Sequence, residues 1–318
     1  MLEVSVVIPN FNGMAYLERV LFSLEKQTMK AFEVILVDNG STDGSVAFVE
    51  KNFPWVRLIR LSQNFGFCRG VNEGIRASRA PYVLLLNNDT ETEPDFVVQM
   101  QKALERHPQA FSCQARMMQF EKRDKIDDAG NYYCAFGWAF ARGKGKEAAA
   151  FLREEQIFAS CAGAAIYRKA LFSQIGYFDE EHFAYLEDTD IGYRARILGY
   201  ENWYAPEAVV YHVGSGTSGS RYNQFKTRYS SRNNIYMIYK NMPLWQIVLN
   251  LPLLAVGFGS KVLFFSLKGL GREYLAGIKN GFQISTKKKK VPFQRKNLRN
   301  YFRIQKELWL NILRRFGK

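Results

Sequence analysis

Polar side chains follow three apolar runs of the sequence, at the points where those runs stop. The three polar stretches are Pro9–Asn12, Asp38–Asn39 and Asn87–Asp89. In open α/β sheets, ligands bind outside the carboxyl ends of the strands, where amide and carboxylate groups of this kind can contact them. Each stretch alone is also typical of a turn, because Asn, Asp and Gly form turns readily. Three such ends, without a Gly-x-Gly-x-x-Gly or Walker loop among them, favour a ligand site of another kind.

A second group of acidic side chains lies far along the chain. Glu187, Asp188 and Asp190 open a segment whose apolar residues recur at helical spacing as far as Ile197. Carboxylates in the first turn of a helix interact favourably with the helix dipole. That effect alone could explain these acids, so their pattern does not by itself indicate catalysis.

The elements that must position these groups alternate between two hydrophobic periods. Short β-branched or apolar runs predict strands at Val4–Pro9, Phe32–Val37, Val56–Leu61 and Tyr82–Leu86. Helical spacing or turn chemistry predicts helices near 14–24, 43–50 and 66–77. This alternation predicts an α/β fold with a parallel sheet, and it brings the three polar stretches to one sheet edge. Residues 119–146 are rich in Gly, Lys, Asp and aromatics, and we expect a mobile loop there.

The composition describes a globular chain. With 318 residues, 47% of them hydrophobic, the chain can bury a substantial core. Its four cysteines are scattered without a Cys-x-x-Cys pair, so neither a zinc ribbon nor a disulfide framework is indicated, and reduced cytosolic thiols are the default expectation. The N-terminus enters a strand-like run directly, so we predict no signal peptide.

Charge divides the chain into two unequal parts. Residues 221–318 hold 21 Lys/Arg and 2 Asp/Glu, a net +19, whereas residues 1–220 have a net −5. This asymmetry indicates an anionic partner, either a membrane or a nucleic acid.

Several motifs occur in one order and carry a family resemblance. They are VSVVIPNFNG, ILVDNGSTDGS, NFGFCRGVNEGI, LLLNNDT, CAGAAIYRK, GYFDEEHFAYLEDTDIGYRARILGY and HVGSGTSG. Together they resemble the family 2 inverting glycosyltransferases, and most closely the bacterial rhamnosyltransferase-like group that builds surface polysaccharides. The resemblance covers roughly the first two thirds of the chain, a span typical of one domain. It implies the GT-A fold, a Rossmann-like nucleotide-binding mixed sheet.

The resemblance implies a divalent metal at the end of the fourth strand. The donor's diphosphate gains negative charge as the sugar leaves, and Mg²⁺ or Mn²⁺ can neutralise it. Asn87–Asp89 stands where the family places its Asp-x-Asp element, so Asp89 becomes the expected metal ligand and Asn88 faces the ribose or diphosphate. The first position is Asn here, a departure that predicts weaker metal binding.

Other positions correspond to the family's donor pocket. Asp38 stands where the family reads a pyrimidine base, and a carboxylate can accept the ring N–H of uracil or thymine. The further donor-binding residues that the resemblance implies are Pro9, Asn10, Asn12, Asn39, Arg69 and Asn72. For Arg69, a surface ion pair is an equally good interpretation.

The acids and one histidine gain roles from the same resemblance. Asp188 is the expected general base that takes the proton of the acceptor hydroxyl, and Glu187 orients the acceptor or the base. Helix capping remains the alternative for both. His212 is expected to contact the metal or the diphosphate, and the segment 214–219 to close over the donor. His107 and His182 are interpreted as structural or solvent-facing.

The basic end of the chain predicts membrane association. Met242–Leu267 is apolar and aromatic but contains Pro252 and Lys261, which favours helices lying in the membrane interface over a single span. The basic residues of the tail would add attraction to anionic lipid. The alternative is a soluble helical bundle or a homodimer interface. No nucleic-acid-binding motif is present, and the apolar run is unsuited to a nucleic-acid partner.

These observations lead to one set of expectations. A GT-A domain covers residues 1–215, an apolar membrane-associating helical region 216–285, and a basic amphipathic tail 286–318. The protein would transfer a sugar from a dTDP or UDP donor, with dTDP-L-rhamnose preferred, to a lipid-linked glycan acceptor. It would act at the cytoplasmic face of the membrane as a peripheral or monotopic protein. The alternatives are a UDP-hexose or UDP-HexNAc transferase of the same fold and a non-catalytic membrane-recruiting scaffold.

Overall fold

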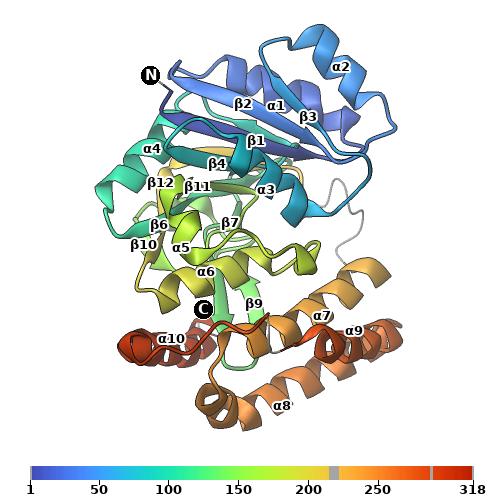
Figure 1. Ribbon diagram of the computed structural model, residues 1–318, viewed down its shortest axis with the longest axis vertical. Coiled ribbons are helices and arrows are strands. Elements are labelled where there is room, and N and C mark those ends of the chain that lie inside the picture. The colour runs from blue at the N-terminus through green and yellow to red at the C-terminus, as the bar shows by residue number, and fades with distance from the viewer. Residues whose placement is uncertain (1, 215–221, 287–288, 317–318) are drawn as a thin grey trace.

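The computed structural model describes residues 2–214, 222–286 and 289–316. Figure 1 shows a sheet flanked by helices, with the C-terminal helices gathered beneath it. The strands are β1 Val4–Asn10, β2 Phe32–Asp38, β3 Arg57–Arg60, β4 Tyr82–Leu86, β5 Thr90–Thr92, β6 Ala110–Gln119, β7 Ile126–Asp128, β8 Asn131–Cys134, β9 Trp138–Ala141, β10 Glu155–Ile157, β11 Ala164–Arg168 and β12 Glu201–His212. The α-helices are α1 Met14–Glu25, α2 Ser45–Asn52, α3 Phe67–Ala77, α4 Phe96–Arg106, α5 Phe172–Ile175, α6 Glu187–Ile197, α7 Gln224–Asn241, α8 Leu244–Leu267, α9 Gly271–Ile284 and α10 Leu298–Phe316.

The main sheet is mixed. Among the described residues its strand order is β10-β12-β6-β11-β4-β1-β2-β3, with β5 and β7 paired to β12 and β6. Strands β1 to β4 pair in parallel, whereas β11 is antiparallel to both β4 and β6. The register places Asn10 directly beside Asp38, so two of the predicted polar ends meet at one edge. The α/β prediction and the mixed GT-A sheet are therefore confirmed.

The middle of the chain differs from the expectation. Residues 119–146, expected as a mobile loop, contain β7 and the two-stranded sheet β8-β9. Tyr133 and Cys134 are buried in β8, and the ring of Tyr132 packs edge-on against Phe140 of β9. The expectation was wrong because the glycines of this region form turns between short strands.

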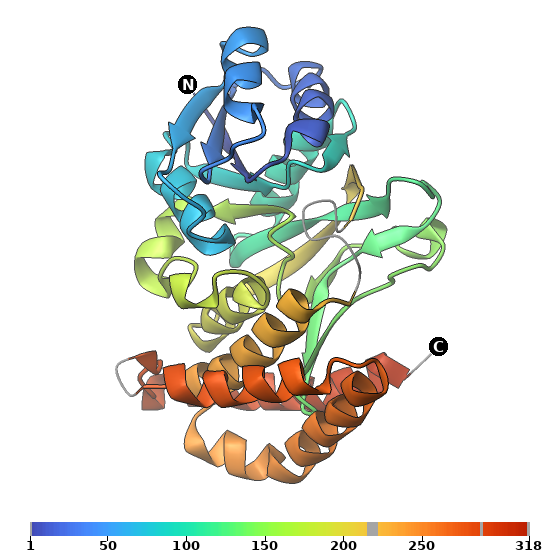
Figure 2. The ribbon, with the colours of Figure 1, turned by 90° about the vertical axis from the view of Figure 1, so that its right-hand side faces the viewer.

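The C-terminal helices share a core with the sheet domain. One hydrophobic cluster joins Tyr193 and Ile197 of α6 to Tyr301, Ile304 and Leu308 of α10. Figure 2 shows the green β8-β9 hairpin reaching down to these helices. The predicted division at residues 215 and 285 stays a prediction, and buried contacts cross the first boundary.

Helix α8 is a continuous helix of 24 residues, and in the described chain it alone is long and apolar enough to cross a membrane. Most of its surface is uncovered, as Leu263 and Leu267 are 63% and 80% exposed. It approaches the hairpin closely at Gly257, where an added Cβ would lie 2.0 Å from the carbonyl oxygen of Phe136, and Leu254 and Phe258 lie near Gly137 of the hairpin. Other residues of α8 contact α9 and α10, as Phe265 stacks on Tyr274 and Asn250 bonds Gln305. The exposed leucines lie outside these contacts.

Candidate active site

A cavity of about 1190 Å³ lies at the carboxyl ends of β1 and β4. The predicted site residues that line it are Pro9, Asn10, Asn39, Asn88, Asp89, Glu187, Asp188 and His212. They come from five separate segments of the chain, and the parallel strands bring the first five residues to one edge of the sheet. The convergence inferred from the strand ends is thus present in the fold.

A chain of amides and one carboxylate forms the sheet side of the cavity. Asn88 Nδ2 donates to Asn10 Oδ1 at 2.8 Å, and Asn10 Nδ2 donates to Asp38 Oδ1 at 3.0 Å. Asp38 Oδ2 accepts from the backbone N–H of Ser41 at 3.0 Å. Asp38 is buried and does not line the cavity, so it lies behind Asn10. This arrangement fixes the orientation of both amides that face the cavity.

A second chain runs from the cavity wall to the β7 region. Asp89 Oδ1 lies 3.2 Å from His212 Nε2, and His212 Nδ1 lies 2.8 Å from Asp127 Oδ2. Lys144 Nζ donates to the other oxygen of Asp127 at 2.6 Å. Burial alone would lower the pKa of His212, but hydrogen bonds and charge from Asp127 and Asp89 raise that pKa to about 10. The imidazole is therefore held in a fixed orientation by a buried carboxylate.

The acids at the start of α6 have different surroundings. Asp188 Oδ2 accepts from Asn131 Nδ2 at 2.8 Å, and Asp188 Oδ1 accepts from the backbone N–H of Thr189 at 2.6 Å. Burial raises the pKa of Asp188, which makes its carboxylate a better proton acceptor. Burial, and then the charge of Asp188, raise the pKa of Glu187 to about 8, and Glu187 Oε2 has no hydrogen-bond partner among the described residues. At neutral pH, the carboxyl group of Glu187 is thus mostly protonated.

Asp190 does not line the cavity, and its side chain bonds to residues of α6 and α7. It is fully buried, and it accepts from Arg194 Nε at 3.0 Å, Lys240 Nζ at 2.9 Å and Asn241 Nδ2 at 2.7 Å. Asp190 therefore joins α6 to α7 through side-chain bonds and does not cap the helix, whose N-terminus has no side-chain cap, while Glu187 and Asp188 face the cavity.

The turn before these acids has an unusual backbone. Phe183, Tyr185 and Leu186 have φ values of 61°, 73° and 66°, a left-handed region that residues with a Cβ rarely adopt. Asn233 of α7 donates to the carbonyl oxygens of His182, Ala184 and Tyr185, at 2.9, 2.8 and 2.7 Å. The C-terminal helix α7 thus holds the turn that presents Asp188.

Besides Asp38, three predicted donor-binding residues lie outside the cavity lining. Asn12 Oδ1 accepts from the backbone N–H of Thr42 at 2.8 Å. Arg69 forms ion pairs with Glu73 at 2.9 Å and Glu180 at 3.2 Å, as its surface-pair interpretation expected. Asn72 is buried and donates to the carbonyl oxygen of Phe178 at 2.8 Å. The structure does not bring these three to the other site residues, and their contacts hold neighbouring loops together.

Asp127 and Asn131 were not identified from the sequence. Both lie in the region that was expected to be a loop, where the sequence gives no periodic signal strong enough to place strands. Of the expected closing segment 214–219, only Gly214 is among the described residues. Residues 215–221 lie outside them.

The donor set suits a hard divalent metal. Asp89 offers an oxygen ligand at the cavity wall, and His212, held from behind by Asp127, offers a nitrogen ligand once a metal displaces its Nε2 proton. Among the described residues there is no cluster of three or more His, Cys, Asp or Glu that could bind a metal alone. Mg²⁺ commonly binds through one or two protein groups together with substrate phosphates and water, so these two side chains fit such an ion.

Comparison with known proteins agrees with this geometry. Residues 5–176 match the family model described as glycosyl transferase family 2. A curated relative from Mycobacterium tuberculosis, N-acetylglucosaminyl-diphospho-decaprenol L-rhamnosyltransferase, is 28% identical over 245 residues, which cover 67% of this chain and 77% of the relative. An uncharacterized glycosyltransferase from Bacillus subtilis, YwdF, is 26% identical over 61% of this chain and 68% of its own length.

Solved structures show the same fold. Residues 1–349 of S. aureus TarS, crystallised with UDP-GlcNAc, superpose with a TM-score of 0.60 at 17% identity, covering 100% of this chain and 93% of TarS 1–349. A mannosyltransferase from Pyrobaculum calidifontis, crystallised with GDP-Man and Mn²⁺, has a TM-score of 0.56 at 13% identity and covers 89% and 88% of the two chains. Because the family model spans more than half of the sequence and the sheet is that of its structural neighbours, the chain belongs to glycosyl transferase family 2 and is a glycosyltransferase with the GT-A fold.

Proposed function

We propose that the protein is an inverting transferase that moves a sugar from a nucleoside diphosphate to a lipid-linked glycan, in bacterial surface polysaccharide synthesis. The observation that carries this proposal is that Asp89 and Asp188, 99 positions apart in the sequence, line one cavity. The preferred donor is dTDP-L-rhamnose, supported by the name of the Mycobacterium tuberculosis relative.

The residues of the cavity can perform an inverting displacement. Asp188 takes the proton of the acceptor hydroxyl onto a carboxylate oxygen while that hydroxyl oxygen bonds to the anomeric carbon. The bond between the sugar and the β-phosphate breaks, and its electron pair leaves with the diphosphate. Asn131 and Thr189 hold Asp188 in place, and Glu187, protonated at neutral pH, can donate a hydrogen bond to the acceptor.

The donor end of the cavity has complementary groups. A divalent metal held by Asp89 and His212 would neutralise charge on the leaving diphosphate. Asn88 faces the ribose or diphosphate in this proposal. Asp38 lies behind Asn10 and accepts from Asn10 and Ser41, so in this proposal it contributes to reading a pyrimidine through the Asn10 amide that it orients.

The scaffold alternative is not supported, because the family is one of transferases and the acids line a cavity. The donor test must distinguish dTDP-L-rhamnose from the alternative donors, a UDP-hexose or a UDP-HexNAc. Purified protein is incubated with dTDP-, UDP- and GDP-sugars, a lipid-linked glycan and Mg²⁺ or Mn²⁺, and released nucleotide is measured. Release with dTDP-L-rhamnose above all other donors supports the preferred donor, and a UDP-sugar as best substrate replaces it.

The assignment of the base is tested with the best donor from that panel. Asp188→Asn should reduce kcat by at least ~10³-fold while nucleotide binding stays within twofold, because the amide cannot accept the proton. Asp124→Asn removes an exposed carboxylate elsewhere and should leave both quantities unchanged. Normal transfer by Asp188→Asn would remove Asp188 as the base.

We further propose that the exposed apolar side of α8 and the basic tail bind the cytoplasmic face of the membrane. The uncovered leucines of α8 and the net charge of +19 over residues 221–318 support this placement. Lys/Arg side chains near an anionic surface contribute about 1 kcal/mol each. A homodimer formed through the same apolar face is the competing explanation.

A further inference from the structure

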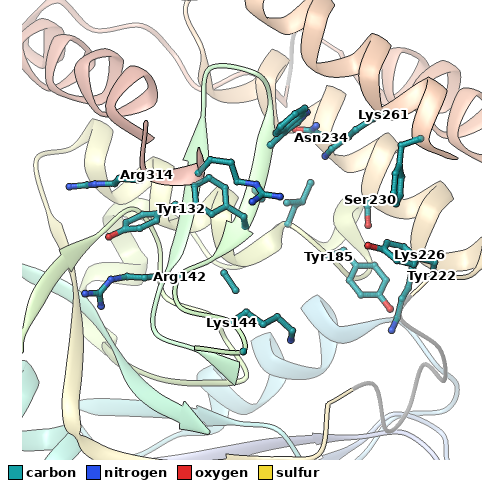
Figure 3. Close-up of a pocket in the computed structure, with 18 of the residues that line it drawn as sticks. Tyr132, Arg142, Lys144, Tyr185, Tyr222, Lys226, Ser230, Asn234, Lys261 and Arg314 are labelled. Atoms are coloured by element: carbon teal, nitrogen blue, oxygen red, sulfur yellow. The ribbon is translucent and has the colours of Figure 1, made fainter. Parts of the chain in front are cut away.

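A second cavity, of about 1320 Å³, lies between the β8-β9 hairpin and helices α7, α8 and α10 (Figure 3). Tyr185, Leu186, Lys226 and Ser230 line both this cavity and the one that contains Asp188. Asn131, which holds Asp188, is the first residue of β8, the strand that contributes Tyr132 to the second cavity. The second cavity therefore opens beside the proposed base.

The walls of the second cavity are strongly basic. Seven Lys and Arg residues line it, together with one carboxylate, Glu155, which pairs with Arg142. Lys261 Nζ makes no hydrogen bond or ion pair with any residue that the structure describes, and neither does the guanidinium of Arg315, which lies 5.7 Å from the ring of Phe140. Burial, and further the positive charge of Arg315, lower the pKa of Lys261 to about 8. Two neighbouring cations without a counter-ion favour an anion between the hairpin and the helices.

The same cavity borders an apolar surface. Phe264 and Phe265 of α8 line it, and Phe264 is 39% exposed. The exposed Leu263 and Leu267 belong to the same stretch of α8. The site thus combines a polar opening toward Asp188, a cationic wall and an apolar exit.

We propose that this second cavity binds the acceptor as a polyprenyl-type diphosphate ester, with its phosphates on Lys261 and Arg315 and its hydrocarbon chain on the exposed face of α8. The inference rests on the proposed function, because it places the acceptor of that reaction. An amphiphile with this order of groups would put its sugar near Asp188, its anionic link on the cations and its alkyl chain on the helix. A nucleic acid does not match the apolar exit, and a donor nucleotide has its metal-binding groups at the other cavity.

The proposal is tested by direct binding to the full chain, independently of transfer. Farnesyl diphosphate, inorganic pyrophosphate and farnesol are titrated separately by isothermal calorimetry into the wild type and two charge-matched double variants. Lys261→Gln with Arg315→Gln removes the two cations of the site. Lys279→Gln with Arg303→Gln removes one exposed lysine and one exposed arginine that do not line the cavity. Binding of dTDP and UDP is measured on every variant.

We expect farnesyl diphosphate to bind the wild type at least tenfold more tightly than either pyrophosphate or farnesol. Lys261→Gln with Arg315→Gln should lose at least tenfold in that affinity, while the control variant and all nucleotide affinities stay within twofold. Equal binding of pyrophosphate or of farnesol, unchanged binding by the site variant, or displacement of farnesyl diphosphate by dTDP or UDP would overturn the proposal. Failure of the wild type to bind any nucleotide while these lipid results hold would reject the proposed function and not the site.

Discussion

The hydrogen bonds from Asn233 to the turn before Asp188 lead to a quantitative prediction. The side-chain amide of Asn233 is fully buried and donates to three carbonyl oxygens of residues 182–185. Asn233→Ala removes both N–H donors that the three carbonyls share, and of these carbonyls only that of His182 keeps a side-chain donor, Arg232 Nη2 at 3.0 Å. At about 1 kcal/mol for each N–H donor, the folded state should lose roughly 2 kcal/mol of stability.

The same substitution should affect catalysis more than stability alone explains. Left-handed φ values at non-glycine residues cost about 1 to 3 kcal/mol each, so the turn should relax when Asn233 no longer holds it. Asp188 follows the turn directly and would move with it. A displacement of about 1 Å in a catalytic group costs on the order of 100-fold in rate, so we expect kcat to fall ~100-fold.

A second buried amide provides the matched control. Gln27 is 1% exposed, and its side chain bonds the backbone near α4 and the side chain of Thr92, outside the cavity. Gln27→Ala should also lower Tm, measured by fluorescence, yet retain kcat within threefold in a nucleotide-release assay run well below both Tm values. If Asn233→Ala lowers Tm but keeps kcat within threefold, the turn does not position Asp188 as argued.

Three further results are expected. Asp127→Asn should weaken Mn²⁺ binding in the presence of nucleotide about tenfold, measured by electron paramagnetic resonance, because a carboxylate no longer orients the metal-binding histidine; an unchanged affinity would contradict this. The pKa of Glu187 is raised to about 8 in the folded state, so the stability that its protonated form contributes is fully present below about pH 4.5 and is lost as the pH rises through 8. Glu187→Gln should therefore raise Tm by several degrees more at pH 8 than at pH 5. Parallel Tm profiles of the variant and the wild type would refute this prediction. The double variant Leu263→Gln with Leu267→Gln should sediment with anionic liposomes at least fivefold less than Leu152→Gln, a control at an exposed leucine of the sheet domain. High salt should also weaken liposome binding by the wild type. Retained liposome binding by the double variant, or a change only in its dimerisation, would exclude α8 as the membrane surface.

The sheet and its polar edge could be predicted because their signals are local. The run before Asn10 and the run before Asn88 are short and buried, and parallel strands must place their carboxyl ends at one edge. The cavity that joins them to Asp188 required the family resemblance, because nothing local indicates that α6 shares a hydrophobic cluster with β4.

Other parts of the site depend on contacts between segments distant in sequence. Asp127 and Asn131 lie in strands of three and four residues, too short for a periodic pattern to identify. Asn72 has a contact that its motif does not indicate. It matches a family motif, yet its amide bonds a backbone carbonyl 106 positions away, and only the folded chain reveals that contact.

The dependence of the catalytic turn on α7 constrains how this enzyme can be recombined. A chimaera that exchanges the first four strands for those of a relative would alter the nucleotide pocket, but the turn before Asp188 would keep its hydrogen bonds to α7. A junction placed between α6 and α7 would instead separate Asp188 from the helix that holds it. Engineers who graft donor preference onto this scaffold should therefore keep residues 176–241 from one parent, so that the turn and its supporting helix are inherited together.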